Sequence, residues 1–331
     1  MEIYWAVKEM AKDLGFADSG CAGASEVSAS VKDAYLYAKE AGFFAGMEYL
    51  HNNMEKRFNP QLLVDGADTV LVFLAPFSLP QGCTPPEGVS QYALGEDYHQ
   101  VIKKKLFQIM EMLESRIEGF SGRAFTDSAP VLEREWGVRA GLGFVGKNNF
   151  LISPRCGIKN FIGTIICNAG LPPTVEMEPE KAACSAGGCG ECTRCLDACP
   201  SGALCKSYTM DAGKCISYHT IENRRLKEDL ALGVVPNFGN RYYGCDACMD
   251  ACPWNSRNLP GWKEFHTNRP MLQQAGYEWW KGLSKEEFKA IFKGSPILRG
   301  GLENIITALE WGKKQGNNGR IEVQDTNLCA G

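Results

Sequence analysis

Hydrophobic residues recur at helical spacing along much of the N-terminal half of the chain. Residues 3–14 have apolar positions three and four apart, and Gly15 follows as the expected C-cap. A second helix is expected over residues 30–41. The longest helix is expected from near Asp97 to Glu118, with an inward face formed by Val101, Ile102, Leu106, Ile109, Met110, Leu113 and Ile117. The first and the longest helix therefore each have a face suited to packing on a core.

Continuous apolar runs between these helices predict buried strands. Residues 69–75 form one such run, bounded by Asp68 and Pro76, and residues 161–167 form another. A short strand is expected over residues 123–127, followed by a helix that starts at Ser128-Ala129-Pro130. Residues 77–91 and 170–187 lack any periodicity and are expected to be connections. The pattern thus indicates a mixed helix and strand fold.

Composition and charge exclude several classes of protein. The chain has 331 residues, enough for two domains, and its hydrophobic share of 44% and charged share of 22% are ordinary for a globular protein. A net charge of -4 gives no overall electrostatic footprint for nucleic acid, so any RNA contact must be local. Neither a signal peptide nor a membrane span is expected. Fifteen cysteines indicate a reducing compartment, which fits the cytoplasm.

Two cysteine runs dominate the second half of the chain. The first is Cys189-x-x-Cys192-x-x-Cys195-x-x-x-Cys199-Pro200, and the second is Cys245-x-x-Cys248-x-x-x-Cys252-Pro253, with Cys215 between them. In this spacing the cysteine before proline ligates the other cluster. Two 4Fe-4S clusters are therefore expected. One would be held by Cys189, Cys192, Cys195 and Cys252, and the other by Cys199, Cys215, Cys245 and Cys248.

Zinc and disulfides are the alternatives for these cysteines. A zinc ribbon needs two Cys-x-x-Cys pairs that make one tetrahedral site, and three cysteines at strict two-residue intervals suit it poorly. A disulfide scaffold is typical of short secreted chains. The spacing favours the two clusters.

Two further segments could carry chemistry. Asp127 lies where the short strand gives way to a helix, so its carboxyl could be an ordinary N-cap or an acid held at the end of a strand. Residues 141–149 form a glycine-rich loop that would let the backbone approach a ligand closely. This loop matches neither a dinucleotide fingerprint nor a phosphate loop, because Lys147 is followed by Asn148.

Several stretches together resemble the epoxyqueuosine reductase family, whose iron-sulfur and corrinoid chemistry is shared with reductive dehalogenases. They recur in order over most of residues 1–310 and go well beyond the cysteines. The stretches are Tyr92-Ala93-Leu94-Gly95-Glu96-Asp97-Tyr98-His99, Asp127-Ser128-Ala129-Pro130-Val131-Leu132-Glu133-Arg134, residues 140–148, residues 215–222, Gly239-Asn240-Arg241-Tyr242-Tyr243-Gly244-Cys245 and Cys252-Pro253-Trp254-Asn255.

The resemblance implies a cobalamin-dependent reductase with an α+β fold. A nitroreductase-like, corrinoid-binding α/β domain would span residues 1–175, and a bacterial-ferredoxin-like double-cluster domain would span 176–260. A helical segment over 261–331 would pack back on that module. The implied reaction converts epoxyqueuosine to queuosine at the wobble position of a tRNA anticodon, with electrons delivered through the two clusters to cobalt.

The resemblance also implies roles for single residues. Asp127 falls on the family's proposed proton donor, and a poorly hydrated pocket would make its carboxyl available as an acid. The cobalamin contacts carried over, besides Asp127, are Arg57, Ser90, Tyr98, Lys147, Asn148, Ser153 and Ser217. His99 and His219 are expected to be structural, because the family binds cobalamin without a histidine below cobalt.

The expected partners are tRNA, an electron donor such as ferredoxin or flavodoxin, and no membrane, with the chain acting as a monomer. A local basic patch that includes Arg224, Arg225 and Lys227 is the candidate tRNA contact. The chain stops at 331 without room for the helical-repeat domain that many family members append, and it departs from the family at His219 and at Gly157-Ile158-Lys159. Two rivals remain: a corrinoid reductase of another small epoxide or halide, and a two-cluster electron-transfer protein.

Overall fold

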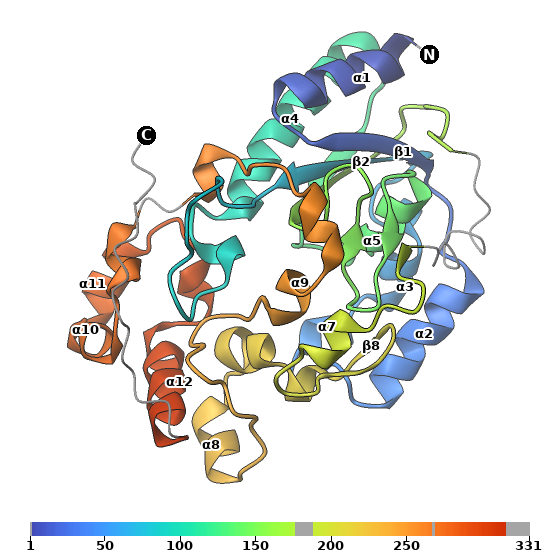
Figure 1. Ribbon diagram of the computed structural model, residues 1–331. Helices are drawn as coiled ribbons and strands as arrows, with labels where there is room; N and C mark the ends of the chain where they lie inside the picture. Colours follow the sequence, from blue (N-terminus) through green and yellow to red (C-terminus); the bar gives the residue numbers. More distant parts are fainter. Residues whose placement is uncertain (1, 176–187, 267–268, 316–331) are drawn as a thin grey trace.

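Helices and short strands alternate along the chain in the computed structural model, which describes residues 2–175, 188–266 and 269–315 (Figure 1). The helices are α1 Glu2–Asp13, α2 Ala29–Glu40, α3 Met54–Phe58, α4 Tyr98–Arg116, α5 Glu133–Arg139, α7 Arg194–Asp197, α8 Leu226–Ala231, α9 Ala247–Asp250, α10 Tyr277–Gly282, α11 Lys285–Ile291 and α12 Leu302–Lys314. The strands are β1 Asp18–Gly23, β2 Thr69–Pro76, β3 Gly122–Phe125, β4 Phe144–Val145, β5 Leu151–Ile152, β6 Asn160–Cys167, β7 Leu204–Lys206 and β8 Thr209–Met210.

A four-stranded sheet in the order β1-β2-β6-β3 organises the N-terminal half. Every neighbouring pair in it is antiparallel, with Val72 opposite both Gly20 and Thr164 in the centre of the sheet. All eight residues of β2 are buried, which confirms the strand expected from the apolar run. Side chains alternate between the two faces of a strand, so a run without polar interruption must be covered on both sides.

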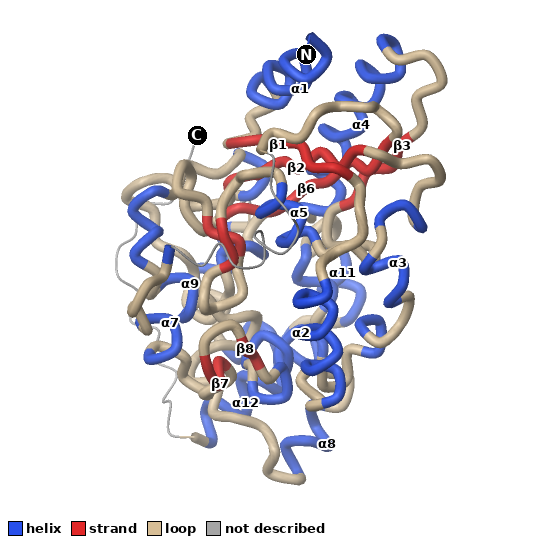
Figure 2. Tube along the Cα trace, turned by 90° about the vertical axis from the view of Figure 1, so that its right-hand side faces the viewer, coloured by secondary structure: helices blue, strands red, loops and turns tan. Residues whose placement is uncertain are grey.

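The two faces of the sheet belong to different cores. Leu71, Phe73 and Ala75 pack with α1 and α4, whereas Val70, Val72 and Leu74 pack with α5. Figure 1 shows α1 and α4 together beside the sheet, and Figure 2 shows the same layering from the side. The apolar faces expected for the first and the longest helix therefore lie where the periodicity placed them.

Two expectations about the end of β3 are corrected. The helix after this strand begins at Glu133 rather than at Pro130, and Leu132 precedes it with no side-chain cap, so Asp127 is not an N-cap. The turn from Asp127 to Leu132 is irregular, since the amide of Val131 bonds back to Ala129 and no helical ladder forms there. Asp127 does lie just beyond the end of β3, in a sheet whose strands are antiparallel, and its role as an acid held there stays a prediction.

The hydrophobic cores cross the boundaries expected at residues 175 and 260. The core under α1 and α4 also contains Met249, Cys252, Trp262 and Phe265 from the cysteine-rich part of the chain. A third core joins Val89 and Leu94 to α12 and to the segment around Trp280. The sheet and the cysteine motifs are thus held together by shared apolar packing, which fixes the cysteines relative to the sheet.

No helix in the described residues is long and apolar enough to cross a membrane. The expectations for the end of the chain, from about residue 317, and for most of the connection over 170–187 lie outside the described residues.

Candidate functional site

Four of the cysteines surround one small cavity. Cys189, Cys192, Cys195 and Cys252 line a space of about 20 Å³ together with Trp254 and other residues. Cys195 belongs to α7, and Cys252 follows α9, which packs against α7. The structure therefore brings the last cysteine of the second run to the first three cysteines of the first run, as the spacing led us to expect.

The other four cysteines form a second group beside the first. Burial raises the pKa of the Cys248 thiol, and the nearby thiols of Cys245, Cys215 and Cys199 raise it further. Cys195 of the first group also acts on Cys248, so the two groups are neighbours. Eight close thiols, of which Cys195 and Cys252 are buried and the others half-buried, would repel one another as thiolates unless cations compensated their charge. The donor set therefore fits two iron-sulfur clusters.

The arrangement differs from a site for one ion. Within residues 2–175, 188–266 and 269–315, no group of three or more His, Cys, Asp or Glu side chains is placed to hold a single metal ion. A single zinc draws its thiolates to a common centre, with Zn–S distances of about 2.3 Å. A cubane instead spreads four thiolates over four irons, and cysteines around a shared cavity suit that requirement.

The Asp127 carboxyl lies at an exposed turn directly after β3. Its backbone has a φ of 47°, a left-handed conformation that aspartate tolerates better than most side chains. The hydroxyl of Tyr98, the first residue of α4, donates a hydrogen bond of 2.6 Å to Oδ2 of Asp127. The Asp127 amide donates a bond of 2.7 Å to Oε1 of Glu133. The carboxyl is thus accessible and held by Tyr98, while Glu133 holds the backbone of the same residue.

Two groups around Asp127 have raised pKa values. Burial, followed by the Asp127 charge, raises the pKa of Glu133 to about 8, so Glu133 holds a proton at neutral pH. Burial also raises the pKa of the Tyr98 phenol, with the Asp127 carboxylate as the next cause. Shifts of this kind concentrate at functional sites.

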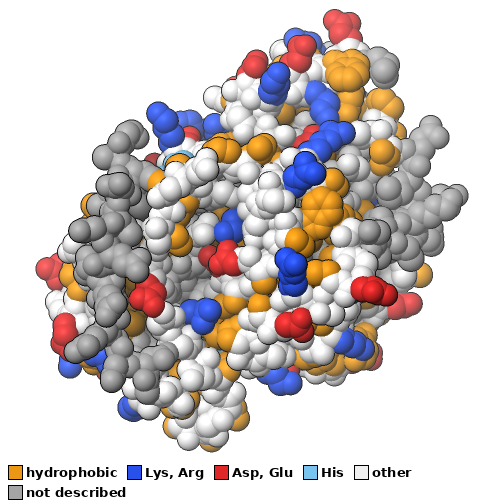
Figure 3. Space-filling model, viewed as in Figure 1, with side chains coloured by type: hydrophobic (Ala, Val, Ile, Leu, Met, Phe, Trp, Pro, Cys, Tyr) orange, Lys and Arg blue, Asp and Glu red, His pale blue; other side chains and the backbone are white. Residues whose placement is uncertain are grey.

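Charged groups from distant segments act on this site. Figure 3 shows several Lys, Arg, Asp and Glu side chains in the middle of the face seen there. Arg299 from the C-terminal segment forms a two-pronged ion pair with Glu222, with a bond of 2.7 Å between Nη2 and Oε2. Asp127 and Tyr49 both act on the pKa of Arg299, which the hydrogen bond to Glu222 raises. Distant segments therefore meet around Asp127.

The residues expected to contact cobalamin have varied surroundings. Tyr98 reaches Asp127, and Arg57 has a buried Nε without a hydrogen-bond partner among the described residues. The other five already bond protein groups. Ser90 bonds Asp246, Lys147 bonds the Gly190 carbonyl, Asn148 bonds the Cys248 carbonyl, Ser153 accepts from the amides of Arg155 and Cys156, and Ser217 bonds the Cys215 thiol.

Both histidines singled out in the sequence make local contacts. His219 is buried, and its Nε2 lies 2.8 Å from the Gly213 carbonyl while Nδ1 lies 3.0 Å from the Asn223 amide. Burial lowers the pKa of His219. The His99 ring instead lies 2.7 Å from the Asp97 carboxylate, at the start of α4. These contacts support the structural roles expected for them.

The expected basic patch is partly engaged within the protein. Arg224 donates to the carbonyl of Arg299, and Lys227 lies 2.5 Å from the Glu303 carboxylate. Arg225 is exposed at the start of α8. The patch as a tRNA contact stays a prediction.

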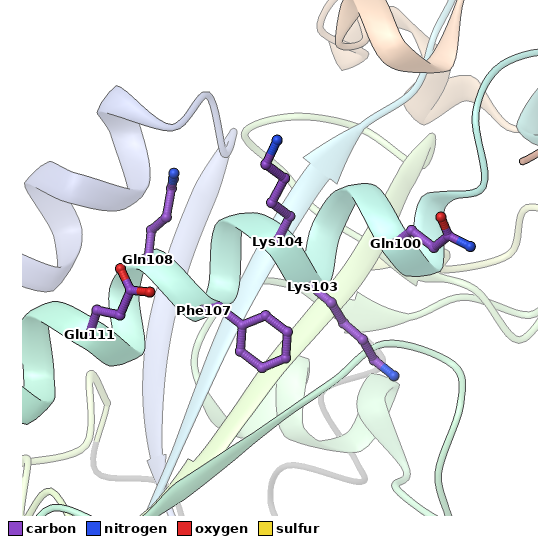
Figure 4. A pocket seen from close by; sticks show the side chains of 6 residues that line it. All are labelled: Gln100, Lys103, Lys104, Phe107, Gln108 and Glu111. Atoms are coloured by element: carbon purple, nitrogen blue, oxygen red, sulfur yellow. The ribbon is translucent and has the colours of Figure 1, made fainter.

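An open hollow lies over α4 and away from the cysteines. Its volume is about 500 Å³, and Figure 4 shows that the six side chains around it all come from one helix. They are Gln100, Lys103, Lys104, Phe107, Gln108 and Glu111. This hollow is bounded by a single exposed helix face with mixed charge. We therefore assign the chemistry to the cysteine and aspartate sites and none to this hollow.

Glu133 and Arg299 were missed as site residues in the sequence. Glu133 is part of the same motif as Asp127, and its position six residues further on was the available signal. The sequence around Arg299 contains no motif that points to a site. Only the fold brings this residue from the C-terminal segment close enough for the Asp127 charge to act on it.

We predict that Glu133→Gln flattens the dependence of stability on pH. Since the pKa of Glu133 is about 8 in the folded state against 4.5 as its ordinary value, the folded state keeps a proton that the unfolded state loses between these pH values. The parent therefore loses stability as pH rises through that window, and Gln removes the effect while keeping an acceptor for the Asp127 amide. We expect a Tm about 2 °C above the parent at pH 8.5 and no gain at pH 5.

The control is Glu114→Gln on the exposed side of α4. Thermal unfolding of the reconstituted proteins across pH 5–9 measures both variants. Parallel curves for Glu133→Gln and the parent would contradict the buried, protonated state of Glu133.

Comparison with known proteins adds the following similarities. Residues 188–255 match the family model of a 4Fe-4S double cluster binding domain, and residues 57–128 match the model described as epoxyqueuosine reductase QueG, DUF1730. The epoxyqueuosine reductase of Cyclobacterium marinum is 36% identical over 298 residues, covering 88% of this chain and 91% of that protein.

Solved structures are similar over almost the whole chain. An epoxyqueuosine reductase bound to an epoxyqueuosine-modified tRNA-Tyr stem loop has a TM-score of 0.78 at 26% identity, over 95% of this chain and 84% of that one. The Bacillus subtilis enzyme, solved with its catalytic aspartate loop swung out of the active site, has a TM-score of 0.77 at 26% identity, over 94% of this chain and 81% of that one.

Proposed function

Because this chain belongs to the epoxyqueuosine reductase family, we propose that it reduces epoxyqueuosine to queuosine at the wobble position of a tRNA anticodon. The observation that carries the proposal is the pairing of two cysteine groups with an accessible, braced Asp127 in one structure. An oxidoreductase that opens an epoxide needs both electrons and a proton. The two cysteine groups would hold the clusters that carry the electrons, and Asp127 would supply the proton.

Two 4Fe-4S clusters and cobalamin are the cofactors of the proposed enzyme. The double-cluster family model covers all eight cysteines assigned above. We place cobalamin beside Asp127. The buried Nε of Arg57, which has no hydrogen-bond partner among the described residues, offers a donor, and Arg57 also bonds the carbonyl of Tyr49, whose phenol pKa is raised by burial and further by the Asp127 charge. Bound there, the cofactors would supply single electrons and a cobalt centre that reacts with the epoxide.

Asp127 is the proposed acid in this scheme. Opening the epoxide creates an alkoxide, and loss of water to form the alkene requires a further proton. The exposed carboxyl can deliver a proton to a bound substrate, and Tyr98 orients it through the bond to Oδ2. Glu133 fixes the turn through the Asp127 amide. The Bacillus subtilis enzyme was solved with its catalytic aspartate loop swung out of the active site, which supports a role for contacts that hold the Asp127 turn in place.

The finer assignments belong to the same proposal. The chain would comprise a nitroreductase-like α/β domain over 1–175, a ferredoxin-like module over 176–260 and a C-terminal helical segment over 261–331, which share apolar cores across these boundaries. The electron donor is a ferredoxin or flavodoxin, the chain acts as a monomer in the cytoplasm, and tRNA contacts include Arg225 on the exposed patch. The relative solved with a tRNA stem loop supports tRNA as the substrate.

The rival functions differ from this proposal in what they require. An electron-transfer protein needs no braced acid, so the contacts of Asp127 with Tyr98 and Glu133 disfavour it. A corrinoid reductase of another small epoxide or halide would use the same site. Conversion of a tRNA substrate separates that rival from the proposed function.

The test is anaerobic reconstitution with iron, sulfide and cobalamin, followed by an assay on tRNA that carries epoxyqueuosine. We expect mass spectrometry of the nucleosides to show conversion to queuosine. The control is the same tRNA with protein that lacks cobalamin. A preparation with two clusters and bound cobalamin but without conversion would contradict the proposed substrate and leave the small-molecule corrinoid reductase as the better assignment.

A further inference from the structure

The glycine-rich loop over residues 141–149 packs directly on both cysteine motifs. Phe144 in β4 contacts the ring of Trp254 edge-on, with centroids 5.6 Å apart, and Trp254 donates to the Gly188 carbonyl just before Cys189. A side chain at Gly188 would overlap the Phe144 ring. The loop and the first cysteine run are therefore closely fitted to each other.

Two adjacent polar residues complete this contact. The Lys147 ammonium donates a bond of 2.7 Å to the carbonyl of Gly190, inside the turn between Cys189 and Cys192. The buried Asn148 amide donates a bond of 3.1 Å to the carbonyl of Cys248 in the other cysteine run. Both residues also line the cavity surrounded by Cys189, Cys192, Cys195 and Cys252.

We propose that Lys147 and Asn148 form a clamp that fixes the two cluster-binding loops to the glycine-rich loop, and that Lys147 sets the potential of the cluster held by Cys189, Cys192, Cys195 and Cys252. The Lys147 ammonium lies at the turn between Cys189 and Cys192 and lines the cavity of the first cysteine group, so its charge acts at short range on whatever those thiolates hold. A cation beside a cluster stabilises the reduced form, which carries one more negative charge. The corrin contact that the resemblance implied for both residues stays a prediction beside this role.

Asn148 contributes geometry rather than charge. Its Nδ2 satisfies a carbonyl that would otherwise be buried beside the second cluster, while its Oδ1 accepts from the Phe150 amide at 3.3 Å. A side chain that bonds both ways is held in one position. The Asn148 amide would then help, together with the apolar packing of the module, to hold the second cysteine run against the glycine-rich loop.

The proposal rests on the cluster assignment under the proposed function, and one experiment separates the two. Parent, Lys147→Gln, Lys147→Arg and the control Lys206→Gln are reconstituted as full chains, and each cluster is titrated with a redox poise and followed by electron paramagnetic resonance. Lys206 lies in β7 of the same module and is exposed. A parent without two clusters would overturn the assignment itself, independently of Lys147.

With both clusters present, Lys147→Gln should make the first cluster about tenfold less reduced at a fixed poise, which is a midpoint about 59 mV lower for one electron. Lys147→Arg and Lys206→Gln should match the parent. Unshifted potentials in Lys147→Gln would overturn the proposal, as would weaker cobalamin uptake without a shift. Lys147→Gln could fail to hold the first cluster at all. In that case Lys147→Arg decides: an iron content and a cluster potential equal to those of the parent support the charge role, and loss of the cluster in Lys147→Arg as well overturns it.

Asn148→Ala tests the second half of the clamp. We expect the cluster held by Cys199, Cys215, Cys245 and Cys248 to lose iron to a chelator several times faster than in the parent, because the Cys248 carbonyl loses its buried partner. An unchanged rate of iron loss would overturn the positioning role of Asn148.

Discussion

Asp127→Asn is expected to abolish most turnover while leaving the protein folded and loaded with its cofactors. Asparagine keeps the size of the side chain and an oxygen that can accept from Tyr98, but it has no acidic proton to give. A positioned acid typically contributes a factor of about 100 to 10,000 in rate. We expect a loss of that size in queuosine formation, measured by mass spectrometry of the tRNA nucleosides.

The controls separate loss of the acid from loss of the site. Iron and cobalamin contents should equal those of the parent, and Asp65→Asn, at an exposed position in the segment before β2, should turn over normally. Glu133→Ala supplies a second comparison, because it removes the acceptor of the Asp127 amide without touching the carboxyl. Undiminished turnover in Asp127→Asn would refute the acid role, whatever Glu133→Ala does.

Local spacing predicted the parts of the molecule that local forces determine. The run over residues 69–75 could only be a strand covered on both faces, and β2 is buried along its length. The helix expected from Asp97 is α4, with Asp97 itself as N-cap. Periodicity in a stretch of sequence reports which face must leave water, and these elements follow it.

Partners brought together from distant segments could not be predicted in the same way. Asp127 looked like a cap because strand-to-helix junctions often have one, yet its carboxyl is held by Tyr98, which lies in another helix. The family resemblance implied cobalamin contacts for Lys147 and Asn148, which stay a prediction, and the fold adds bonds from both residues to the loops of the cysteine motifs. Sequence patterns identify the reactive residue types, and only the fold decides what each of them touches.

The crossed arrangement of the cysteines leads to the second large effect. Cys252 is the last cysteine of the second run, but it lines the cavity of Cys189, Cys192 and Cys195 and lies among their thiols. Cys245 and Cys248 lie instead with Cys215. A chain in which each run held its own cluster would not place the residue there.

Cys252→Ala should therefore remove the cluster that it shares with Cys189, Cys192 and Cys195. The cluster held by Cys199, Cys215, Cys245 and Cys248 should remain. We expect iron to fall from about eight to about four atoms per chain, and turnover to vanish because electrons lose one of their two carriers. The spectrum of the surviving cluster should match that of Cys192→Ala and differ from that of Cys248→Ala. Cys205→Ala, an exposed cysteine outside both runs, is the matched control and should retain both clusters. If Cys252→Ala instead matches Cys248→Ala, each run holds its own cluster and the crossed assignment is wrong.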